Sequence, residues 1–290
     1  MTLLAAASID LLVLGPVAIS GALYLSGARE IRRRTRRGPG VAGWRMIAFG
    51  AGLLAIIVAL ISPIDQLSEE LFAVHMVQHL LLTLVAAPLI VLGAPLVPIL
   101  AALPVGWRRR LAAPTQGAGF RAIWRVASYP LTAWLLSAAV LWSWHVPAMY
   151  DLALGNQAVH IVEHASFLTA GLLFWWSLIR PVGREATPPA AAVLYVFTTG
   201  IHSSALGALL TFSTNVWYSA HEPFVAAWGL TAIEDQQLAG LIMWVPAGAV
   251  YLGAALVLAA MALITPAPAR DDPTSGYAIR ARRADELVRE

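Results

Sequence analysis

Residues 71–92 read LFAVHMVQHLLLTLVAAPLIVL and contain no aspartate, glutamate, lysine or arginine. A helix needs about 20 apolar residues to cross the hydrocarbon core of a bilayer, so this stretch predicts a transmembrane helix. The same stretch carries two histidines, His75 and His79, four residues apart near its start. Ionisable side chains are costly inside a membrane and usually serve a function there. The stretch therefore predicts a helical membrane protein with a polar feature inside the bilayer.

Six further apolar runs lie on either side of this stretch, in a chain of 290 residues that is 59% hydrophobic and only 12% charged. This composition excludes a water-soluble domain and indicates several membrane spans. We expect an all-α bundle of seven transmembrane helices. The expected spans are residues 9–27, 41–61, 71–92, 129–144, 158–179, 190–212 and 238–264.

All 19 basic residues are arginines, and they occupy alternate gaps between the apolar runs together with the C-terminal segment. Because cytoplasmic loops of membrane proteins retain lysine and arginine, this pattern predicts an N-terminus outside and a C-terminus in the cytoplasm. The pattern also places all seven histidines in the outer half of the protein. The remaining gaps hold acidic residues and no arginine, namely Asp65, Glu69, Glu70, Asp151, Glu222, Glu234 and Asp235.

The chain ends and one short segment complete the expected topology. We expect residues 1–265 to form the transmembrane domain and residues 266–290 to form a mobile cytoplasmic tail. The first apolar run has no basic leader and no small-residue cleavage site, so we expect a retained span and not a signal peptide. Residues 93–103 are apolar but short and interrupted by prolines, which favours an interfacial or re-entrant segment on the inner side.

Composition excludes several chemistries. The chain has no cysteine, so disulfides, thiolate metal sites and iron–sulfur clusters are excluded. Membrane orientation accounts for the arginines, and no lysine-rich tract indicates a nucleic acid partner. A zinc protease is disfavoured because neither histidine pair has the HExxH pattern.

A second histidine pair, His160 and His164, repeats the spacing of His75 and His79 on the expected span 158–179. Residues four apart on a helix share a face and lie about 6 Å apart along its axis, so each pair can close on one ion. Counted from the span starts, both pairs come at a similar depth below the outer surface. We therefore predict a metal site from both pairs and three further polar groups at overlapping depth. These are His202, His145 and Asp235.

The available donors favour copper over other ions. Imidazole and carboxylate donors without a thiolate suit copper, while zinc is possible and iron stays open. The outer methionines Met76, Met149 and Met243 are explained more simply by packing, although thioethers suit Cu(I). Haem is a competing cofactor, because histidines from two helices can ligate it axially. It would leave the second member of each pair unused. A purely structural role for the histidines is the remaining alternative.

Six segments of the chain carry a resemblance to a known family. They are HMVQHLLL at 75–82, APLIVLGAP at 87–95, WHVPAMY at 144–150, HIVEH at 160–164, GLLFWW at 171–176 and EDQQLAGLIMWVP at 234–246. Together they resemble the CtaG family of seven-span cytochrome c oxidase assembly factors, over about residues 40–260. The resemblance carries the family's acidic motif over to Asp235 and leaves His221 in a segment that does not match. Its histidine pattern carries over to His75, His79, His145, His160, His164 and His202.

The resemblance implies a role in the maturation of cytochrome c oxidase, which contains copper and haem. Passing copper by ligand exchange needs no turnover, so we expect no enzyme activity. The implied partners are oxidase subunits, the lipid bilayer and an extracytoplasmic copper donor, and the implied location is the bacterial cytoplasmic membrane. Copper binding itself is our inference from the histidine layer. The alternatives are a bis-histidine haem-binding cytochrome, a transporter of copper or protons, and a scaffold for oxidase subunits. The apolar inner halves of the spans argue against a conductive path.

Overall fold

The computed structural model describes residues 3–35, 40–179 and 188–264. Over these residues the chain folds into helices and contains no strand. The predicted all-α membrane fold is confirmed, because six helices are long and apolar enough to cross a membrane. The expected tail at 266–290 and the inner-loop residues Arg180 and Arg184 lie outside the described residues.

The six spanning helices match six of the seven expected spans. They are α1 (Leu3–Arg34), α2 (Gly43–Leu60), the composite helix Phe72–Gly93, α11 (Gln157–Ile179), α12 (Pro189–Thr211) and α14 (Ala232–Ile264). The shorter helices are α3 (Pro63–Glu70), α6 (Leu96–Ala102), α7 (Val105–Gln116), α10 (Pro147–Gly155), η3 (Ser219–His221), α13 (Glu222–Val225) and η4 (Ala226–Trp228).

The expected span at 129–144 differs from the other six. It is α9 (Pro130–Trp144), whose 15 residues rise about 22 Å, less than the roughly 30 Å of a bilayer core. The preceding helix α8 (Ala118–Ala127) is bent away from α9 by 65° at a short break before Pro130. A count of seven spans therefore holds only if α8 and α9 cross the membrane as one bent span.

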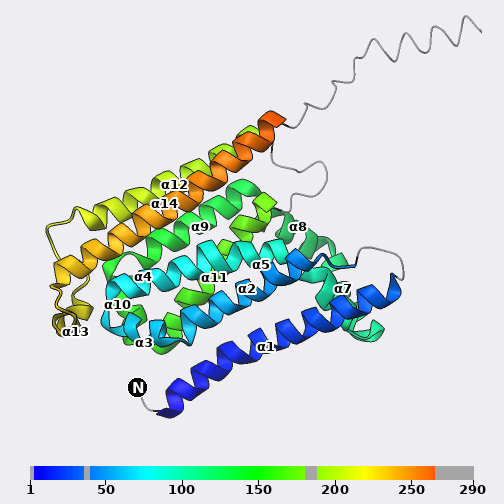
Figure 1. Cartoon of the computed structure of the whole chain (residues 1–290), viewed down its shortest axis with the longest axis horizontal. Helices are drawn as coiled ribbons and strands as arrows, with labels where there is room; N and C mark the ends of the chain where they lie inside the picture. Colours follow the sequence, from blue (N-terminus) through cyan, green and yellow to red (C-terminus); the bar gives the residue numbers. More distant parts are fainter. Residues whose placement is uncertain (1–2, 36–39, 180–187, 265–290) are drawn as a thin grey trace, which may run out of the picture.

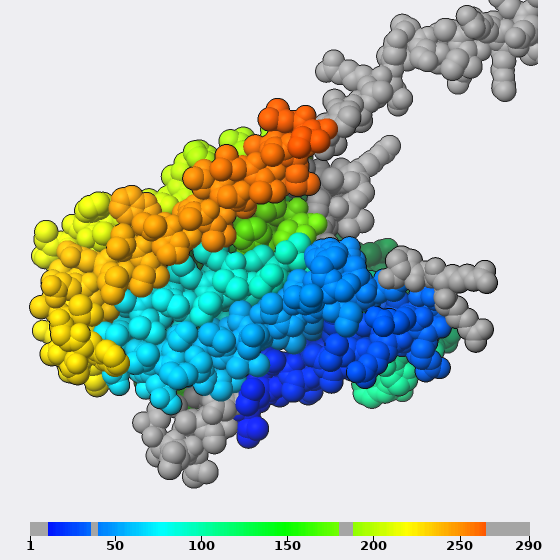
Figure 2. Space-filling model, viewed as in Figure 1, coloured from blue at the N-terminus to red at the C-terminus, as the bar shows by residue number. Residues whose placement is uncertain are grey.

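The helices form an elongated bundle with two distinct edges (Figure 1). The pair α12 and α14 lies along one edge, and α1 lies along the opposite edge. Between them lie α2, α9, α11 and the composite helix. In the space-filling view, α1 and α2 run side by side on one flank of the visible face, with α14 on the other flank (Figure 2).

The short helices separate by charge between the two ends of the bundle. The arginine-bearing helices α7 and α8 lie at one end, and α3, α10 and α13 lie at the other (Figure 1). Acidic residues such as Glu69 and Asp151 belong to that second end. The side of the membrane that each end faces stays a prediction from the charge pattern. The short helix α6, with seven residues, is not among the candidate spans.

The composite helix Phe72–Gly93 changes its hydrogen-bond pattern halfway along. It consists of α4 (Phe72–Leu80), a π-helical segment η1 (Leu81–Ala86) and α5 (Ala87–Gly93). Pro88 explains the change, because a proline inside a helix cannot donate to the carbonyl four residues earlier and clashes with it. Such π-bulges recur at functional sites. Here the π-helical segment begins two residues after His79.

Candidate metal centre

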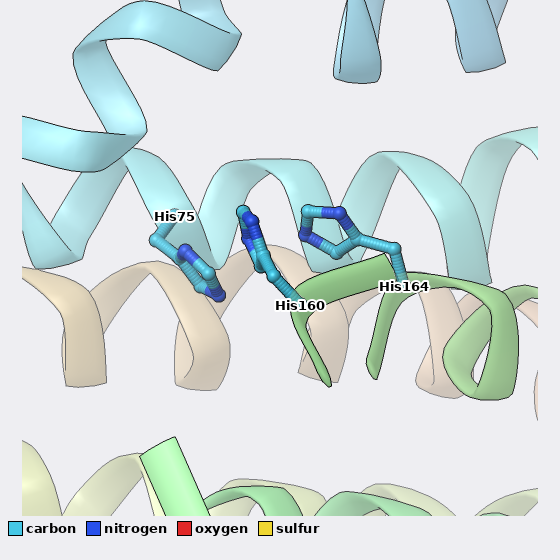
Figure 3. A group of neighbouring side chains, drawn as sticks. All are labelled: His75, His160 and His164. Carbon is cyan, nitrogen blue, oxygen red and sulfur yellow. The ribbon is translucent and has the colours of Figure 1, made fainter. Parts of the chain in front are cut away.

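The two histidine pairs face one another across the contact between α4 and α11. The rings of His75 and His160 lie 5.4 Å apart between centroids, and those of His75 and His164 lie 5.6 Å apart. The His79 and His164 rings are 5.4 Å apart. Figure 3 shows His75 extending from α4 toward the rings of His160 and His164, which come from α11. Helices distant in sequence thus place four imidazoles in one group.

A carboxylate joins this group from the same face of α11. The Glu163 Oε1 atom lies 3.6 Å from the Nε2 atoms of both His75 and His79. This separation is too long for a hydrogen bond, so the carboxylate approaches two imidazoles without bonding to either. The set of metal ligands predicted from the sequence did not include Glu163. Its position three residues after His160, on the same helix face, was the signal for a closer role.

The donor atoms of these residues are close enough to share an ion. Nitrogen atoms of His75, His160 and His164 all lie within 4.8 Å of one another. Donor atoms of His75, His79 and Glu163 form a second such set, so that His75 belongs to both. We call these five residues the α4–α11 cluster. Metal–nitrogen bonds are about 2.0 Å long, so atoms within 4.8 Å can bind one ion after small side-chain movements.

The α4–α11 cluster is buried except for the half-buried His160, and it is poorly hydrogen-bonded. His75 and Glu163 have no exposed surface, and His79 and His164 are buried as well. Within the described residues, both ring nitrogens of His75 and of His79 and both oxygens of Glu163 have no hydrogen-bond partner. A buried polar atom without a partner costs about 1–3 kcal/mol. Bonds to a cation would satisfy these lone pairs, which is what a metal site requires.

Neighbouring side chains hold α4 in position. Gln78 donates to the backbone oxygen of Ala59 at 2.8 Å and to Oδ1 of Asp65 at 2.9 Å, which holds α4 against α2 and α3. On the other side, the Trp175 indole donates to the backbone oxygen of Thr83 at 2.9 Å, which joins α11 to the π-helical segment. The two contacts fix the rotation of α4, so that its histidines face α11.

The structure places Asp235 outside the α4–α11 cluster. Its carboxylate accepts the backbone N–H groups of Phe72 at 2.8 Å and Ala73 at 3.0 Å. These are the first residues of α4, whose N-terminal N–H groups have no partner within the helix. Asp235 therefore ties α14 to the start of α4, three residues before His75. The depth of Asp235 along its helix could be counted from the sequence, whereas the direction in which its side chain faces depends on tertiary packing.

His145 lies beside the α4–α11 cluster and not within it. Its ring is 6.2 Å from that of His79 between centroids. Its Nδ1 atom lies 2.6 Å from the backbone oxygen of Leu141, and its Nε2 atom lies 3.3 Å from the sulfur of Met76. His145 follows the last turn of α9, so its contacts reach back to that helix and across to α4.

His202 and His221 have other neighbours. The His202 ring packs edge-on against Trp134 at 5.3 Å, and it lines a cavity together with His79 and His145. His221 lies 2.6 Å from the Tyr150 hydroxyl through its Nε2 atom. Burial lowers the pKa of His221 below its usual value and raises the pKa of Tyr150, so both stay neutral near pH 7. His221 is a hydrogen-bonding packing residue.

The family model described as cytochrome c oxidase caa3 assembly factor matches residues 22–263. The chain belongs to this family. The resemblance found in the sequence is thereby confirmed.

Relatives of this caa3 assembly factor family member come from mycobacteria. Uncharacterised proteins of Mycobacterium bovis and Mycobacterium tuberculosis are each 28% identical over 226 residues, which are 76% of this chain and 34% of the relative. An uncharacterised protein of Mycobacterium leprae is 23% identical over 240 residues, 81% of this chain and 36% of the relative. The chain spans about a third of the length of these curated relatives. No solved structure matches it.

Residues 22–263, which match the family model, include the whole α4–α11 cluster. They also include His145, His202 and Asp235, which lie beside the cluster or support it. The family match and the buried donor atoms therefore concern the same part of the chain.

Proposed function

We propose that this protein is a cytochrome c oxidase assembly factor of the cell membrane that binds copper at the α4–α11 cluster. The observation that carries the proposal is the convergence of four imidazoles and one carboxylate from two helices, with donor atoms within 4.8 Å in each set. The family supplies the link to oxidase assembly. Holding and releasing a metal by ligand exchange needs no catalytic turnover, so no enzyme activity is proposed.

The donor set favours copper. Imidazole nitrogen suits copper, zinc and iron, and mixed nitrogen and oxygen donors such as four imidazoles with the Glu163 carboxylate suit Cu(II). Copper is also a metal that cytochrome c oxidase requires. Zinc is the competing ion, and metal analysis separates the two.

A large cavity supports loading of the cluster from the end of the bundle that carries the acidic residues. Its volume is about 950 Å³, and its lining includes His160 and His164 together with residues of α1 and α2. The carboxylates of Asp65, Glu69 and Asp151 also line it. Negative charge in a cleft attracts cations and speeds their association. The charge pattern of the loops predicts that this end faces the outside, where a copper donor would meet it.

The short distance between the two histidine pairs disfavours a haem held between α4 and α11. A haem between His75 and His160 would have to separate rings whose centroids are 5.4 Å apart. The Phe167 ring packs against His79, with 4.1 Å between the ring centroids. The hydrogen bond from Trp175 on α11 to Thr83 in the π-helical segment opposes any widening of the gap.

Metal analysis of purified protein tests the proposal. We expect the full-length protein, loaded with copper in detergent and desalted, to retain copper and to show no Soret band. His75→Gln and His164→Gln should lose most of this copper. His221→Gln is the matched control, because His221 lies outside the cluster and should leave copper binding unchanged.

Cell membranes give the second measurement. In cells without their own copy of the gene, the wild-type protein and H221Q should restore cytochrome c oxidase activity, and H75Q and H164Q should not. Normal copper content in both cluster variants would contradict the proposed site. A Soret band in the purified protein would show that the cofactor is haem and not copper.

A further inference from the structure

A second group of potential ligands lies next to the α4–α11 cluster and involves a methionine. The Nε2 atom of His145 lies 3.3 Å from the sulfur of Met76, and both side chains are buried. They line a cavity of about 70 Å³ among α4, α9, α11, α12 and α14. The buried side chain of Met243 lines the same cavity.

The tautomer of His145 follows from its other nitrogen. The Nδ1 atom is 2.6 Å from the backbone oxygen of Leu141, and a carbonyl oxygen can only accept a hydrogen bond. Nδ1 therefore carries the ring proton and donates it. Burial disfavours the charged form with protons on both nitrogens. The lone pair of Nε2 consequently points toward the sulfur of Met76.

Two lone-pair donors thus face each other across 3.3 Å with no hydrogen between them. Neither a thioether sulfur nor an unprotonated imidazole nitrogen can donate a hydrogen bond to the other. A cation between them resolves this arrangement. If the metal–nitrogen bond is about 2.0 Å and the metal–sulfur bond about 2.3 Å, one ion can bind both atoms with a nitrogen–metal–sulfur angle of roughly 100°.

We propose that Met76 and His145 form a second metal site that is selective for Cu(I), with Met243 as a further thioether donor. Thioether ligands select soft cations such as Cu(I) over Zn(II) and Cu(II). Among the described residues, those that line this cavity include no aspartate or glutamate, in contrast to the α4–α11 cluster with Glu163. The two sites therefore differ in chemical softness.

His79 connects the two sites. It belongs to the α4–α11 cluster through its approach to Glu163, and it lines the cavity that contains Met76 and His145. Its ring centroid is 6.2 Å from that of His145. An ion can therefore pass from one site to the other with His79 as a shared ligand. This transfer rests on the proposed function, whereas occupancy of the second site can be measured without it.

X-ray absorption of the full-length protein loaded anaerobically with Cu(I) in detergent tests the second site. We expect two bound equivalents and sulfur scattering at about 2.3 Å from copper. Met76→Leu keeps the side-chain volume and should lose the sulfur signal and one equivalent. Met149→Leu is the matched control, because Met149 lies on α10, outside the cavity, and should leave both unchanged. His145→Gln provides an independent variant that should also lose one equivalent.

The variants separate failure of this site from failure of the proposed function. Loss of one equivalent in H164Q with retention of the sulfur signal supports two sites. If M76L and H145Q keep both equivalents and H164Q loses one, the second site is refuted while the α4–α11 cluster stands. If M76L loses its equivalent and H75Q and H164Q lose nothing, the second site stands and the cluster is refuted. Absence of sulfur scattering in the wild-type protein refutes the second site outright.

Discussion

Two helix contacts in this protein are built in opposite ways. In the contact between α12 and α14, Gly207 and Gly240 let the backbones touch, since a Cβ at Gly240 would lie 2.6 Å from the Gly207 oxygen. In the contact between α4 and α11, buried imidazoles and the Glu163 carboxylate lie between the helices. Small residues at an interface are the common way to pack membrane helices.

This difference shows which contact serves stability alone. At the centre of the glycine contact, the Thr211 hydroxyl donates to the Gly207 oxygen at 2.8 Å, so this polar side chain has a hydrogen-bond partner. The α4–α11 contact keeps ring nitrogens and carboxylate oxygens that have no hydrogen-bond partner among the described residues. Such groups destabilise a fold unless something binds them. Their presence at one contact and not at the other is the physical argument for a ligand at the α4–α11 cluster.

The largest effect is expected from breaking the glycine contact. Gly240→Ala would place a Cβ 2.5 Å from the Thr211 backbone nitrogen and 2.6 Å from the Gly207 oxygen, so α12 and α14 must separate. We expect the free energy of unfolding to fall by about 1–3 kcal/mol or more. Thermal unfolding in detergent measures it. Gly253→Ala, on the same helix, adds a Cβ with nothing within 4 Å and should have little effect. Equal stability of the two variants would contradict this packing.

A smaller and different effect is expected from Glu163. Glu163→Gln keeps the side-chain volume and removes the negative charge beside His75 and His79. We expect copper affinity to fall by roughly ten-fold or more, as for loss of a charged ligand or its close partner. Removal of a buried carboxylate without a hydrogen-bond partner should leave the protein as stable as before or more stable in the absence of metal. Competition with a chromophoric chelator measures the affinity.

Glu222→Gln is the control for this comparison, because Glu222 is exposed on α13. It should change neither affinity nor stability. If E163Q binds copper as tightly as the wild-type protein, Glu163 takes no part in the site.

The smallest effect on stability is expected from Asp235, which connects α14 to the start of α4. Asp235→Asn leaves one carbonyl oxygen to accept from the start of α4, in place of a carboxylate that accepts from Phe72 and Ala73. We expect a loss of about 0.5–2 kcal/mol in stability, the range for a lost helix cap. Copper binding should persist, because Asp235 supports α4 and does not bind the ion. Asp151→Asn, at an exposed position, should leave the unfolding temperature unchanged. Complete loss of copper in D235N, with the fold intact, would make Asp235 a ligand.

The spans could be predicted because length and hydrophobicity alone determine whether a helix can cross a bilayer. Six of the seven expected spans have counterparts in the structure. The bend between α8 and α9 could not be predicted from the apolar run at 129–144, because its angle depends on packing around Pro130. The π-helical segment η1 escaped prediction for a similar reason, although Pro88 marks its position.

The candidate site was predictable in part. Spacing of four residues showed that each histidine pair shares one helix face, and depth showed that the pairs lie at one level. The rotation of each helix about its axis depends on tertiary contacts such as those of Gln78 and Trp175. The sequence indicates the depth of a residue but not the rotation of its helix, so we grouped Asp235 and His202 with the histidine pairs. In the structure Asp235 contacts the start of α4 and His202 packs against Trp134. For the same reason Glu163 was left out of the predicted ligand set, although the structure places its carboxylate within the cluster.

The number of imidazoles around one bound ion tests the central claim most directly. The protein loaded with one equivalent of Cu(II) can be measured by X-ray absorption and pulsed EPR, which count histidine rings at the metal. We predict at least three imidazoles at the copper of the wild-type protein, and loss of most of this copper both in H75Q on α4 and in H164Q on α11. Fewer than three imidazoles, or rings that come from only one of the two helices, would contradict the account.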